Sequence, residues 1–217
     1  MANNYIVLDC ETGGLDETKT PMTQLAFKAI DGETFEEILK FETFIKPYGG
    51  LIIDQKVLET KSTVKMSDIV KYGIDSKELV SKIIYTFKNL KTTSKGDSGL
   101  PVLVGHNVKF DIKFLRYVFH LHGQDLFNYI SIDTFDTQRL SNLTWKSQLK
   151  SGEAQAMRLG ICCKRAGIEL VDAHGAMADV EATTKLFIYF IDRLISSTTS
   201  SGEKEKKTNN NRTYYQF

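Results

Sequence analysis

The stretch YIVLDCETGGLD, which begins at Tyr5, constrains the fold more than any other part of the chain. Its run of apolar residues predicts a strand that enters the core, yet the strand ends in Asp9 and Glu11. Alternate residues of a strand point the same way, so the two carboxylates share one face. Buried like charges are costly unless a partner or a metal ion neutralises them. The stretch therefore predicts that other parts of the fold bring such a partner to this point.

The composition is that of an ordinary globular domain. The chain has 217 residues, of which 41% are hydrophobic and 25% charged, and its formal net charge is +1. This length suits one compact domain with a sizeable core. The charge balance gives no bulk attraction to nucleic acid or membranes, although a carboxylate-rich site can offset basic residues elsewhere. No signal peptide or long apolar run is present, so we expect a soluble, cytoplasmic protein without a membrane partner.

The cysteines indicate neither a disulfide framework nor a zinc site. Cys162 and Cys163 are adjacent and lack the spacer typical of zinc-binding pairs, and Cys10 lies far from both in the sequence. We expect all three to be small buried hydrophobic residues.

The order of the apolar patterns predicts an α/β domain. Strands are expected at residues 5–10, 24–30 and 38–46. Apolar residues at helical spacing between positions 79 and 90 predict one amphipathic helix. A polar loop at residues 92–100 then leads into the short apolar strand PVLVG and a helix that begins near Lys109. Further helices are expected at residues 134–149, 155–166 and 178–195.

The composition changes at residue 196, where the chain becomes rich in Ser, Thr and Asn and nearly free of aliphatic residues. This change predicts a folded domain at residues 1–195 and a flexible polar tail at residues 196–217. The tail ends in the aromatic sequence YYQF, which is typical of a short peptide that docks on a partner. The alternative interpretation is a terminus without a function of its own.

Two further segments place carboxylates at the mouths of predicted elements. Asp111 stands in the first turn of the helix that follows PVLVG, just after His106 and Asn107. His174 and Asp179 flank the start of the last helix. They converge only if His174 lies in the preceding loop, because five residues span about 140° of a helix.

A carboxylate at a helix start is favourable without any function, and each segment alone is explained in that way. Asp133 and Asp136 are interpreted as such helix-start carboxylates. Asn107 is interpreted in two ways: its side chain caps the helix, or it binds a substrate.

Together, the three segments resemble those of the DnaQ-like DEDDh 3′→5′ exonucleases, a family that includes the proofreading epsilon subunit of bacterial replicative DNA polymerase. Residues 9–14 match Asp-x-Glu-Thr-x-Gly, with Gly13 where many members carry a second Thr. Residues 106–111 match His-Asn-x-x-Phe-Asp, and residues 174–179 match His-x₄-Asp. The resemblance covers residues 4–195, whereas residues 58–63 match the family only loosely.

The resemblance implies a ribonuclease H-like fold, with a mixed central sheet whose first strands are antiparallel and which helices flank. It also implies two-metal phosphodiester hydrolysis with Mg²⁺, for which Mn²⁺ substitutes. The implied metal ligands are Asp9, Glu11, Asp111 and Asp179. His174 is implied to take the proton from the attacking water.

The resemblance also implies how a single-stranded 3′ end is held. Leu15 and Phe110 are expected to pack beside the terminal nucleotide. Thr12 and Gly13 are expected to offer backbone N–H groups to its 3′-hydroxyl, and His106 and Asn107 to contact the substrate.

The function expected on these grounds is a 3′→5′ DNA exonuclease that proofreads for a separate polymerase, docked through the tail. The first alternative is an RNA-processing exonuclease of the same superfamily, because the 2′-hydroxyl distinguishes RNA from DNA and no motif here selects against it. The second is a non-catalytic nucleic-acid-binding module.

Overall fold

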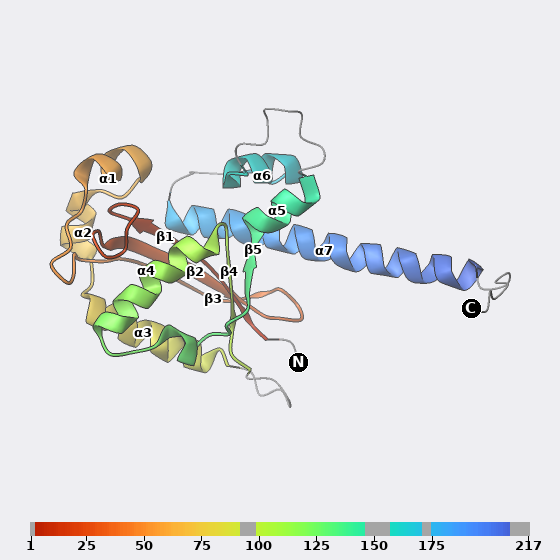
Figure 1. Ribbon diagram of the computed structural model, residues 1–217, viewed down its shortest axis with the longest axis horizontal. Helices are drawn as coiled ribbons and strands as arrows, with labels where there is room; N and C mark the ends of the chain where they lie inside the picture. The colour runs from red at the N-terminus through yellow and green to blue at the C-terminus, as the bar shows by residue number, and fades with distance from the viewer. Residues whose placement is uncertain (1–2, 92–98, 146–156, 171–174, 209–217) are drawn as a thin grey trace, which may run out of the picture.

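In the computed structural model, the chain forms a five-stranded mixed sheet with helices on both faces (Figure 1). The structure describes residues 3–91, 99–145, 157–170 and 175–208, without the side chains of residues 59, 61 and 197–208. The strand order is β3-β2-β1-β4-β5. The strands are β1 (Tyr5–Thr12), β2 (Met22–Ile30), β3 (Glu37–Phe44), β4 (Val102–Gly105) and β5 (Thr134–Asp136). The first three pair antiparallel, whereas β4 and β5 continue the sheet in parallel.

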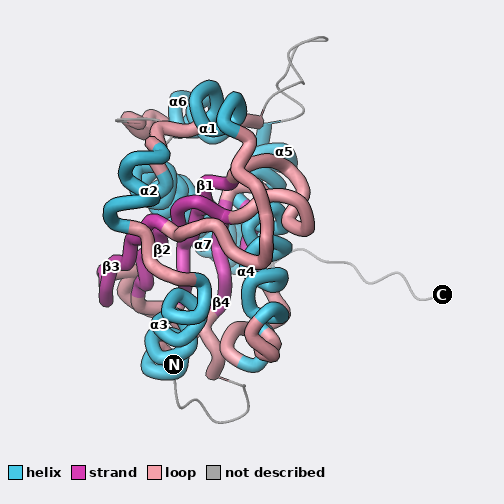
Figure 2. Tube along the Cα trace, turned by 90° about the vertical axis from the view of Figure 1, so that its left-hand side faces the viewer, coloured by secondary structure: helices cyan, strands magenta, loops and turns pink. Residues whose placement is uncertain are grey.

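The helices divide between the two faces and the end of the sheet (Figures 1 and 2). On one face lie α3 (Ser76–Asn89) and α4 (Val108–Leu121), and on the other lies α7 (Ala176–Thr208). The remaining helices are α1 (Gln55–Lys61), α2 (Met66–Tyr72), the 3₁₀ turn η1 (Leu126–Asn128), α5 (Thr137–Trp145) and α6 (Leu159–Ala166). None of the helices in the described part of the chain combines the length and apolarity needed to cross a membrane.

The alternation of β1 decides which way its carboxylates point. Ile6, Leu8 and Cys10 belong to the core beneath α3 and α4, whereas Val7 packs with α7. Because side chains alternate along a strand, Asp9 and Glu11 follow Val7 and face the α7 side. The hydrophobic pattern of β1 thus carries both carboxylates to the face on which α7 begins.

Helix α7 is held against the sheet by an aromatic cluster and an ionic network. The ring of Phe187 is fully buried and lies 5.0 Å from Tyr5 and 5.3 Å from Phe135, centroid to centroid. Glu181 bonds to the nearly buried ammonium of Lys28 on β2 and lies 2.7 Å from that of Lys40 on β3. These contacts fix the first turns of α7 over β1 and β2.

Most of the predicted elements and the fold class are confirmed. The helix predicted at residues 134–149 is wrong at its start, because Thr134 and Phe135 extend as β5 beside β4 and α5 begins only at Thr137. Both residues favour strands, and pairing with β4 provides the context that decides between the two states. The short helices α1 and α2 have too few turns to give a periodic signal and were not expected.

The end of α7 also differs from the expectation. The helix continues through residue 196 to Thr208 and projects beyond the sheet (Figure 1). Extending an existing helix costs far less than nucleating one, so a polar segment rich in Glu and Lys follows the packed part of α7. The aromatic tip of the predicted tail lies outside the described residues, as does most of the loop at residues 92–100. All three cysteines are free and buried, as expected.

Replacing Phe187 by Ala tests how far α7 depends on the aromatic cluster. We expect a loss of about 3–5 kcal/mol in the free energy of unfolding, because a fully buried ring leaves a cavity. Urea denaturation followed by far-UV circular dichroism measures the change. As a control on the same helix, Leu194→Ala removes a side chain that is 55% exposed and should change stability by about 0.5 kcal/mol or less. Equal losses in the two variants would contradict the packing described here.

Candidate active site

A tight turn follows β1 and brings its end close to the start of β2. The backbone N–H of Gly13 donates to the carbonyl of Pro21 at 2.8 Å, and the Thr12 hydroxyl donates to the carbonyl of Gly14 at 2.6 Å. A Cβ on Gly14 would stand 2.8 Å from a methyl carbon of Thr20, so only glycine fits there. The turn explains why the motif after Glu11 is rich in small residues.

The bond from Gly13 corrects one expectation. Since its N–H already binds Pro21 within the protein, Gly13 does not hold a donor ready for a 3′-hydroxyl. The pairing of β1 with β2 shifts register between Glu11 and Thr12, and this irregularity turns the Gly13 N–H towards the neighbouring strand.

Asp111 reaches the end of β1 from the opposite face of the sheet. Its side chain is buried, and Oδ1 accepts the backbone N–H of Cys10 at 3.0 Å. The thiol of Cys10 forms a second hydrogen bond with the same carboxylate. Cys10, which lies between Asp9 and Glu11, therefore fixes the carboxylate of Asp111, although the two residues are 101 positions apart in the sequence.

Asp179 completes the group from α7. It lies in the first turn of that helix, and its N–H donates to the carbonyl of Gly175 at 3.0 Å. His174, the expected proton acceptor, lies outside the described residues. The structure thus brings four of the five expected chemical residues to one place, namely Asp9, Glu11, Asp111 and Asp179.

Burial and mutual repulsion raise the pKa values of the carboxylates. Burial raises the pKa of Asp9 well above its usual range, and three neighbouring carboxylates raise it further, those of Asp111, Asp179 and Glu11. Burial also raises the pKa of Glu11 to about 7. It raises that of Asp111 to about 7 as well, against the hydrogen bonds from Cys10. Such mutual repulsion in a buried place is what a bound cation relieves.

Ser62 belongs to this group although the sequence did not point to it. It follows the last residue of α1, and its side chain forms a hydrogen bond with Glu11 that opposes the rise in the pKa of that carboxylate. The weak family resemblance at residues 58–63 was the only signal at this position, and it did not single out the serine.

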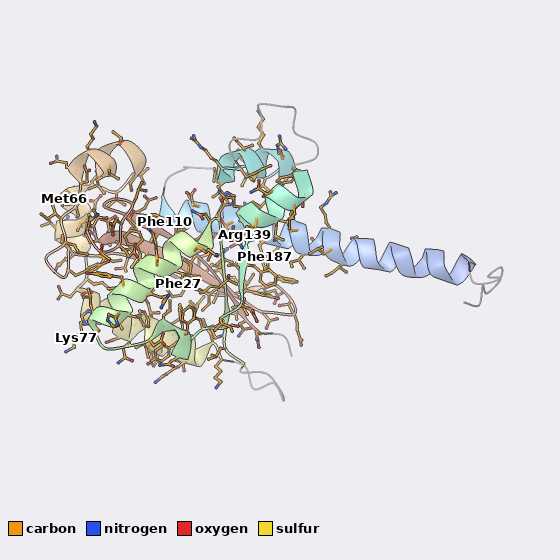
Figure 3. The ribbon with its side chains drawn as sticks, in the orientation of Figure 1. Phe27, Met66, Lys77, Phe110, Arg139 and Phe187 are labelled. Atoms are coloured by element: carbon orange, nitrogen blue, oxygen red, sulfur yellow. The ribbon has the colours of Figure 1, made fainter. Side chains whose placement is uncertain are left out.

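Leu15 follows the turn after β1, and Phe110 immediately precedes Asp111 on α4. The side chain of Leu15 is 79% exposed, and Phe110 is half-buried at the start of α4 (Figure 3). Lys113 links them, since its ammonium donates to the carbonyl of Leu15 at 2.5 Å and lies 4.9 Å from the centre of the Phe110 ring. Lys113 therefore connects the backbone of Leu15 with the ring of Phe110.

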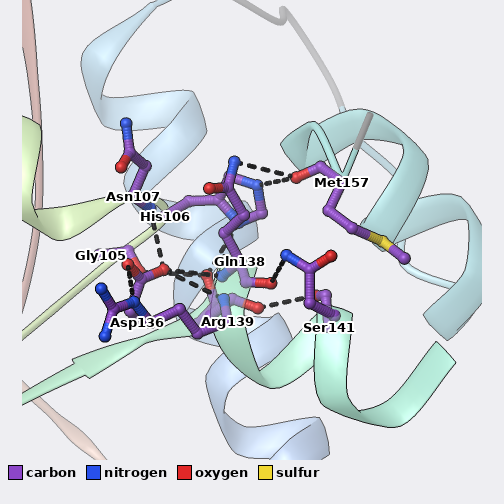
Figure 4. A network of polar contacts seen from close by, with 10 residues as sticks. Gly105, His106, Asn107, Asp136, Gln138, Arg139, Ser141 and Met157 are labelled. Atoms are coloured by element: carbon purple, nitrogen blue, oxygen red, sulfur yellow. Dashed lines mark hydrogen bonds and ion pairs between the residues drawn. The ribbon is translucent and has the colours of Figure 1, made fainter. Parts of the chain in front are cut away.

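His106 differs from its expected role in contacting a substrate. Nε2 lies 2.6 Å from the carbonyl of Met157, which only accepts, so Nε2 carries a proton (Figure 4). Nδ1 lies 2.9 Å from the hydroxyl of Thr137. Burial lowers the pKa of His106, which favours this neutral tautomer. Both ring nitrogens are thus engaged within the protein, and neither is left for a substrate.

Asn107 adopts an unusual backbone conformation directly before α4. Its φ of 70° lies in the left-handed region, and its side chain makes no capping bond to the helix. Of the two readings of Asn107, capping is therefore not the one found in the structure. The side chain of Asn107 is exposed.

The donor set fits hard divalent cations. Carboxylate oxygens are the ligands that Mg²⁺ and Mn²⁺ prefer, and the described part of the site offers no thiolate aligned with them. Within the described ranges, no three His, Cys, Asp or Glu side chains lie close enough together, as they stand, to hold a metal ion. An open group of mutually repelling carboxylates is the arrangement that leaves coordination positions for water and substrate.

Comparison with known proteins gives the family. Residues 6–187 match the exonuclease family of the ribonuclease T type. DNA polymerase III PolC-type of Oceanobacillus iheyensis is 26% identical over 193 residues, which are 89% of this chain and 12% of that protein. The PolC-type enzyme of Halalkalibacterium halodurans is 29% identical over 186 residues, which are 86% of this chain and 11% of that protein. The chain thus spans only about an eighth of the length of these relatives.

Solved structures show the same fold. Escherichia coli exonuclease I in complex with a dT13 oligonucleotide superposes with a TM-score of 0.71 at 20% identity, over 90% of this chain and 43% of that one. The zinc-bound form of the same enzyme with single-stranded DNA gives a TM-score of 0.69 over 85% of this chain and 39% of that one, also at 20% identity.

Metal binding should stabilise the protein in a pH-dependent way. The folded-state pKa of Glu11 and Asp111 is raised to about 7, so the metal-free protein loses stability as pH rises through about 5–7. Mg²⁺ or Mn²⁺ at about 100 times its dissociation constant should restore about 2.7 kcal/mol at pH 8 and clearly less at pH 5.5, where protons compete. Differential scanning fluorimetry at both pH values measures this shift in melting temperature.

Asp9→Asn serves as the matched variant, because it keeps the shape of the side chain and removes one of the repelling charges. Without metal at pH 8 it should melt above the wild type, and added Mn²⁺ should shift it little. Equal metal-induced shifts in both proteins, or a larger shift at pH 5.5, would contradict a carboxylate metal site.

Proposed function

The chain belongs to the exonuclease family, and on this premise we propose that it removes nucleotides one at a time from the 3′ end of single-stranded DNA. Exonucleases of this family use divalent metal ions. The observation that carries the proposal is the convergence of carboxylates from β1, α4 and α7 at one end of the sheet. A phosphodiester gathers negative charge as it is cleaved, so a site built to hold cations beside a strand-binding mouth suits this reaction.

In the proposed mechanism, Asp9, Glu11, Asp111 and Asp179 hold two Mg²⁺ ions, for which Mn²⁺ substitutes. When bound, these ions polarise the phosphate and lower the pKa of the attacking water. Asp9, whose pKa the carboxylates of Glu11, Asp111 and Asp179 raise, would help to hold both ions, with Glu11 and Asp179 holding one and Asp111 the other, as the family resemblance implies. Ser62 and Cys10 orient Glu11 and Asp111 through hydrogen bonds. His174 takes the proton from the water, by the resemblance of its motif.

The terminal nucleotide is proposed to lie between Leu15 and Phe110. Apolar contact with a base is independent of its identity, as an enzyme that removes any nucleotide requires. The exposed amide of Asn107 and the backbone of Thr12 are the proposed polar contacts to that nucleotide. This assignment leaves Gly13 and His106 with structural roles, in keeping with their internal hydrogen bonds.

A row of basic side chains on α4 supports an anionic polymer as the substrate. Lys109, Lys113, Arg116 and His120 recur at steps of three and four residues, which places them within a stripe about 60° wide. The stripe runs along the exposed side of α4, on the side opposite the buried Asp111, over a pocket of about 390 Å³ that Lys113, Arg116 and His120 line together with two acids. Of these acids, Glu17 pairs with Lys113 at 3.2 Å, and Asp125 accepts the N–H of Phe127. The stripe suits the phosphates upstream of the 3′ end.

DNA is preferred to RNA in this proposal because the PolC-type relatives are DNA polymerases and the exonuclease I complexes contain DNA. The same relatives support a polymerase or another replication protein as the partner, for which this chain proofreads. An RNA-processing exonuclease is the alternative, and it differs in accepting a 2′-hydroxyl.

Digestion of 5′-labelled oligonucleotides tests the reaction. With Mg²⁺, single-stranded DNA should shorten from its 3′ end in single-nucleotide steps, more rapidly than double-stranded DNA or RNA of the same sequence. Asp9→Asn and His174→Ala should each lower kcat by at least about a hundredfold. His174→Ala should still show the metal-induced rise in melting temperature. Internal cuts, shortening from the 5′ end, or full activity of Asp9→Asn would refute the proposal.

Salt dependence tests the cationic stripe. In the inactive Asp9→Asn background, Arg116→Gln should reduce the slope of log K against log salt by about 0.7, the share of one phosphate contact with a single strand. Fluorescence anisotropy with a labelled oligo-dT at several salt concentrations measures the slope. Arg193→Gln is the matched control, because both arginines lie over an aromatic ring, Phe127 at 5.2 Å and Tyr189 at 5.4 Å. An unchanged slope in Arg116→Gln, or an equal change in the control, would remove the stripe from the binding surface.

A further inference from the structure

The junction between β4 and α4 has an unusual backbone conformation. Asp111 is placed by the start of α4, and that start follows Asn107, whose left-handed backbone disfavours any residue with a side chain. Such a conformation persists only where neighbouring groups fix it. Gly105 approaches closely as well, since a Cβ there would stand 2.9 Å from the Cβ of Val108. The position of Asp111 therefore depends on whatever holds residues 105–107.

The carboxylate of Asp136 holds Asn107. Its Oδ1 accepts the backbone N–H of Asn107 at 3.1 Å, in addition to those of Gln138 at 2.9 Å and Arg139 at 3.3 Å (Figure 4). The side chain is only 9% exposed. One buried oxygen atom thus caps α5 and also binds the residue from which α4 starts.

Thr137, the next residue, holds the two residues before Asn107. Its hydroxyl lies 3.1 Å from the carbonyl of Gly105 and 2.9 Å from Nδ1 of His106. Nε2 of His106 donates its proton in the hydrogen bond to the Met157 carbonyl, so Nδ1 of the neutral ring is an acceptor. The Thr137 hydroxyl therefore donates either to Nδ1 or to the Gly105 carbonyl. His106 in turn ties the junction to Met157, which lies two residues before the start of α6. Residues 105, 106 and 107 are therefore each held by one of two residues of the β5–α5 junction, Gly105 and His106 by Thr137 and Asn107 by Asp136.

We propose that Asp136 and Thr137 are positioning residues of the proposed nuclease, which fix the β4–α4 junction and through it the carboxylate of Asp111. The proposal rests on the proposed function in so far as Asp111 holds a metal ion. Simple capping of α5 needs only the bonds to Gln138 and Arg139 and predicts no effect on the site. The third bond, to Asn107, is the feature that capping leaves unexplained, and it joins segments 29 residues apart.

Two substitutions at one position separate the hydrogen bonds from the charge. Asp136→Ala and Asp136→Asn both remove the negative charge, but only Asn keeps an oxygen acceptor for the three N–H groups. Asp136→Ala should weaken Mn²⁺ binding about tenfold and lower kcat on single-stranded DNA about 10–100-fold, as loss of outer contacts to a metal site does, while KM changes less than about threefold. Asp136→Asn should return both Mn²⁺ affinity and kcat to near the wild-type values. Isothermal titration with Mn²⁺ and steady-state kinetics measure the two effects.

A control and a second position keep the test decisive if Asp136→Ala folds poorly. Asp31→Ala also removes a carboxylate that accepts two backbone N–H groups, at 2.9 and 2.8 Å, but in the turn at the other end of β1. It should lose comparable stability and keep its Mn²⁺ affinity. Thr137→Val removes the hydroxyl with little change in shape and should weaken Mn²⁺ binding, whereas Thr137→Ser should not.

Loss of stability without loss of Mn²⁺ affinity in Asp136→Ala and Thr137→Val would overturn the proposal and leave both residues as parts of an ordinary helix cap. The same conclusion follows if Asp31→Ala weakens Mn²⁺ binding equally. Metal titration needs no substrate, so it tests the positioning role separately from the reaction. Wild-type protein that binds Mn²⁺ but digests no DNA would refute the proposed function alone.

Discussion

Repulsion among the buried carboxylate of Asp111 and three half-buried ones at the end of β1 is the constraint around which the structure is arranged. Asp9 and Glu11 lie on the same face of one strand, and Asp111 and Asp179 approach from two helices. Left to itself, this arrangement costs stability, as the raised pKa values of Glu11 and Asp111 express. The arrangement persists because packing in the rest of the core fixes the positions of β1, α4 and α7. The proposed metal ions then recover, on binding, free energy that the fold gave up in assembling their ligands.

The three elements are fixed by different means. β1 lies at the centre of the sheet, between β2 and β4, and its alternating apolar residues fill the cores on both faces. α7 is fixed by Phe187 and by the ion pairs of Glu181 with β2 and β3. α4 is fixed near its start by polar contacts, from Cys10 to Asp111 and from Asp136 to Asn107. A site whose ligands come from separate elements therefore depends equally on packing and on a few directed hydrogen bonds.

What the sequence predicted correctly was local or was carried by a motif. Four of the five strands and the amphipathic helices follow from spacing and residue type, whereas the group of four carboxylates came from the resemblance to a family, and its metal-binding role stays a prediction. The contacts that hold these carboxylates did not follow, because Cys10 and Asp111 lie 101 residues apart and Ser62 meets Glu11 only after α1 has packed. Gly13 and His106 were misjudged for the same reason. Their polar groups are consumed by Pro21, Thr137 and Met157, partners that no local pattern identifies.

The alternation of side chains along β1 also determines what a misfolded chain would be able to do. The residues that fill the core beneath α3 and α4 and the carboxylates that face α7 are interleaved along one strand, so they cannot be displaced independently. A slip of β1 by a single residue would bury Asp9 and Glu11 among apolar side chains and expose the core residues to the other face. Such a chain would lose its fold and its chemistry in one event. A chain with that register would bring no group of carboxylates together and would lack the proposed activity altogether.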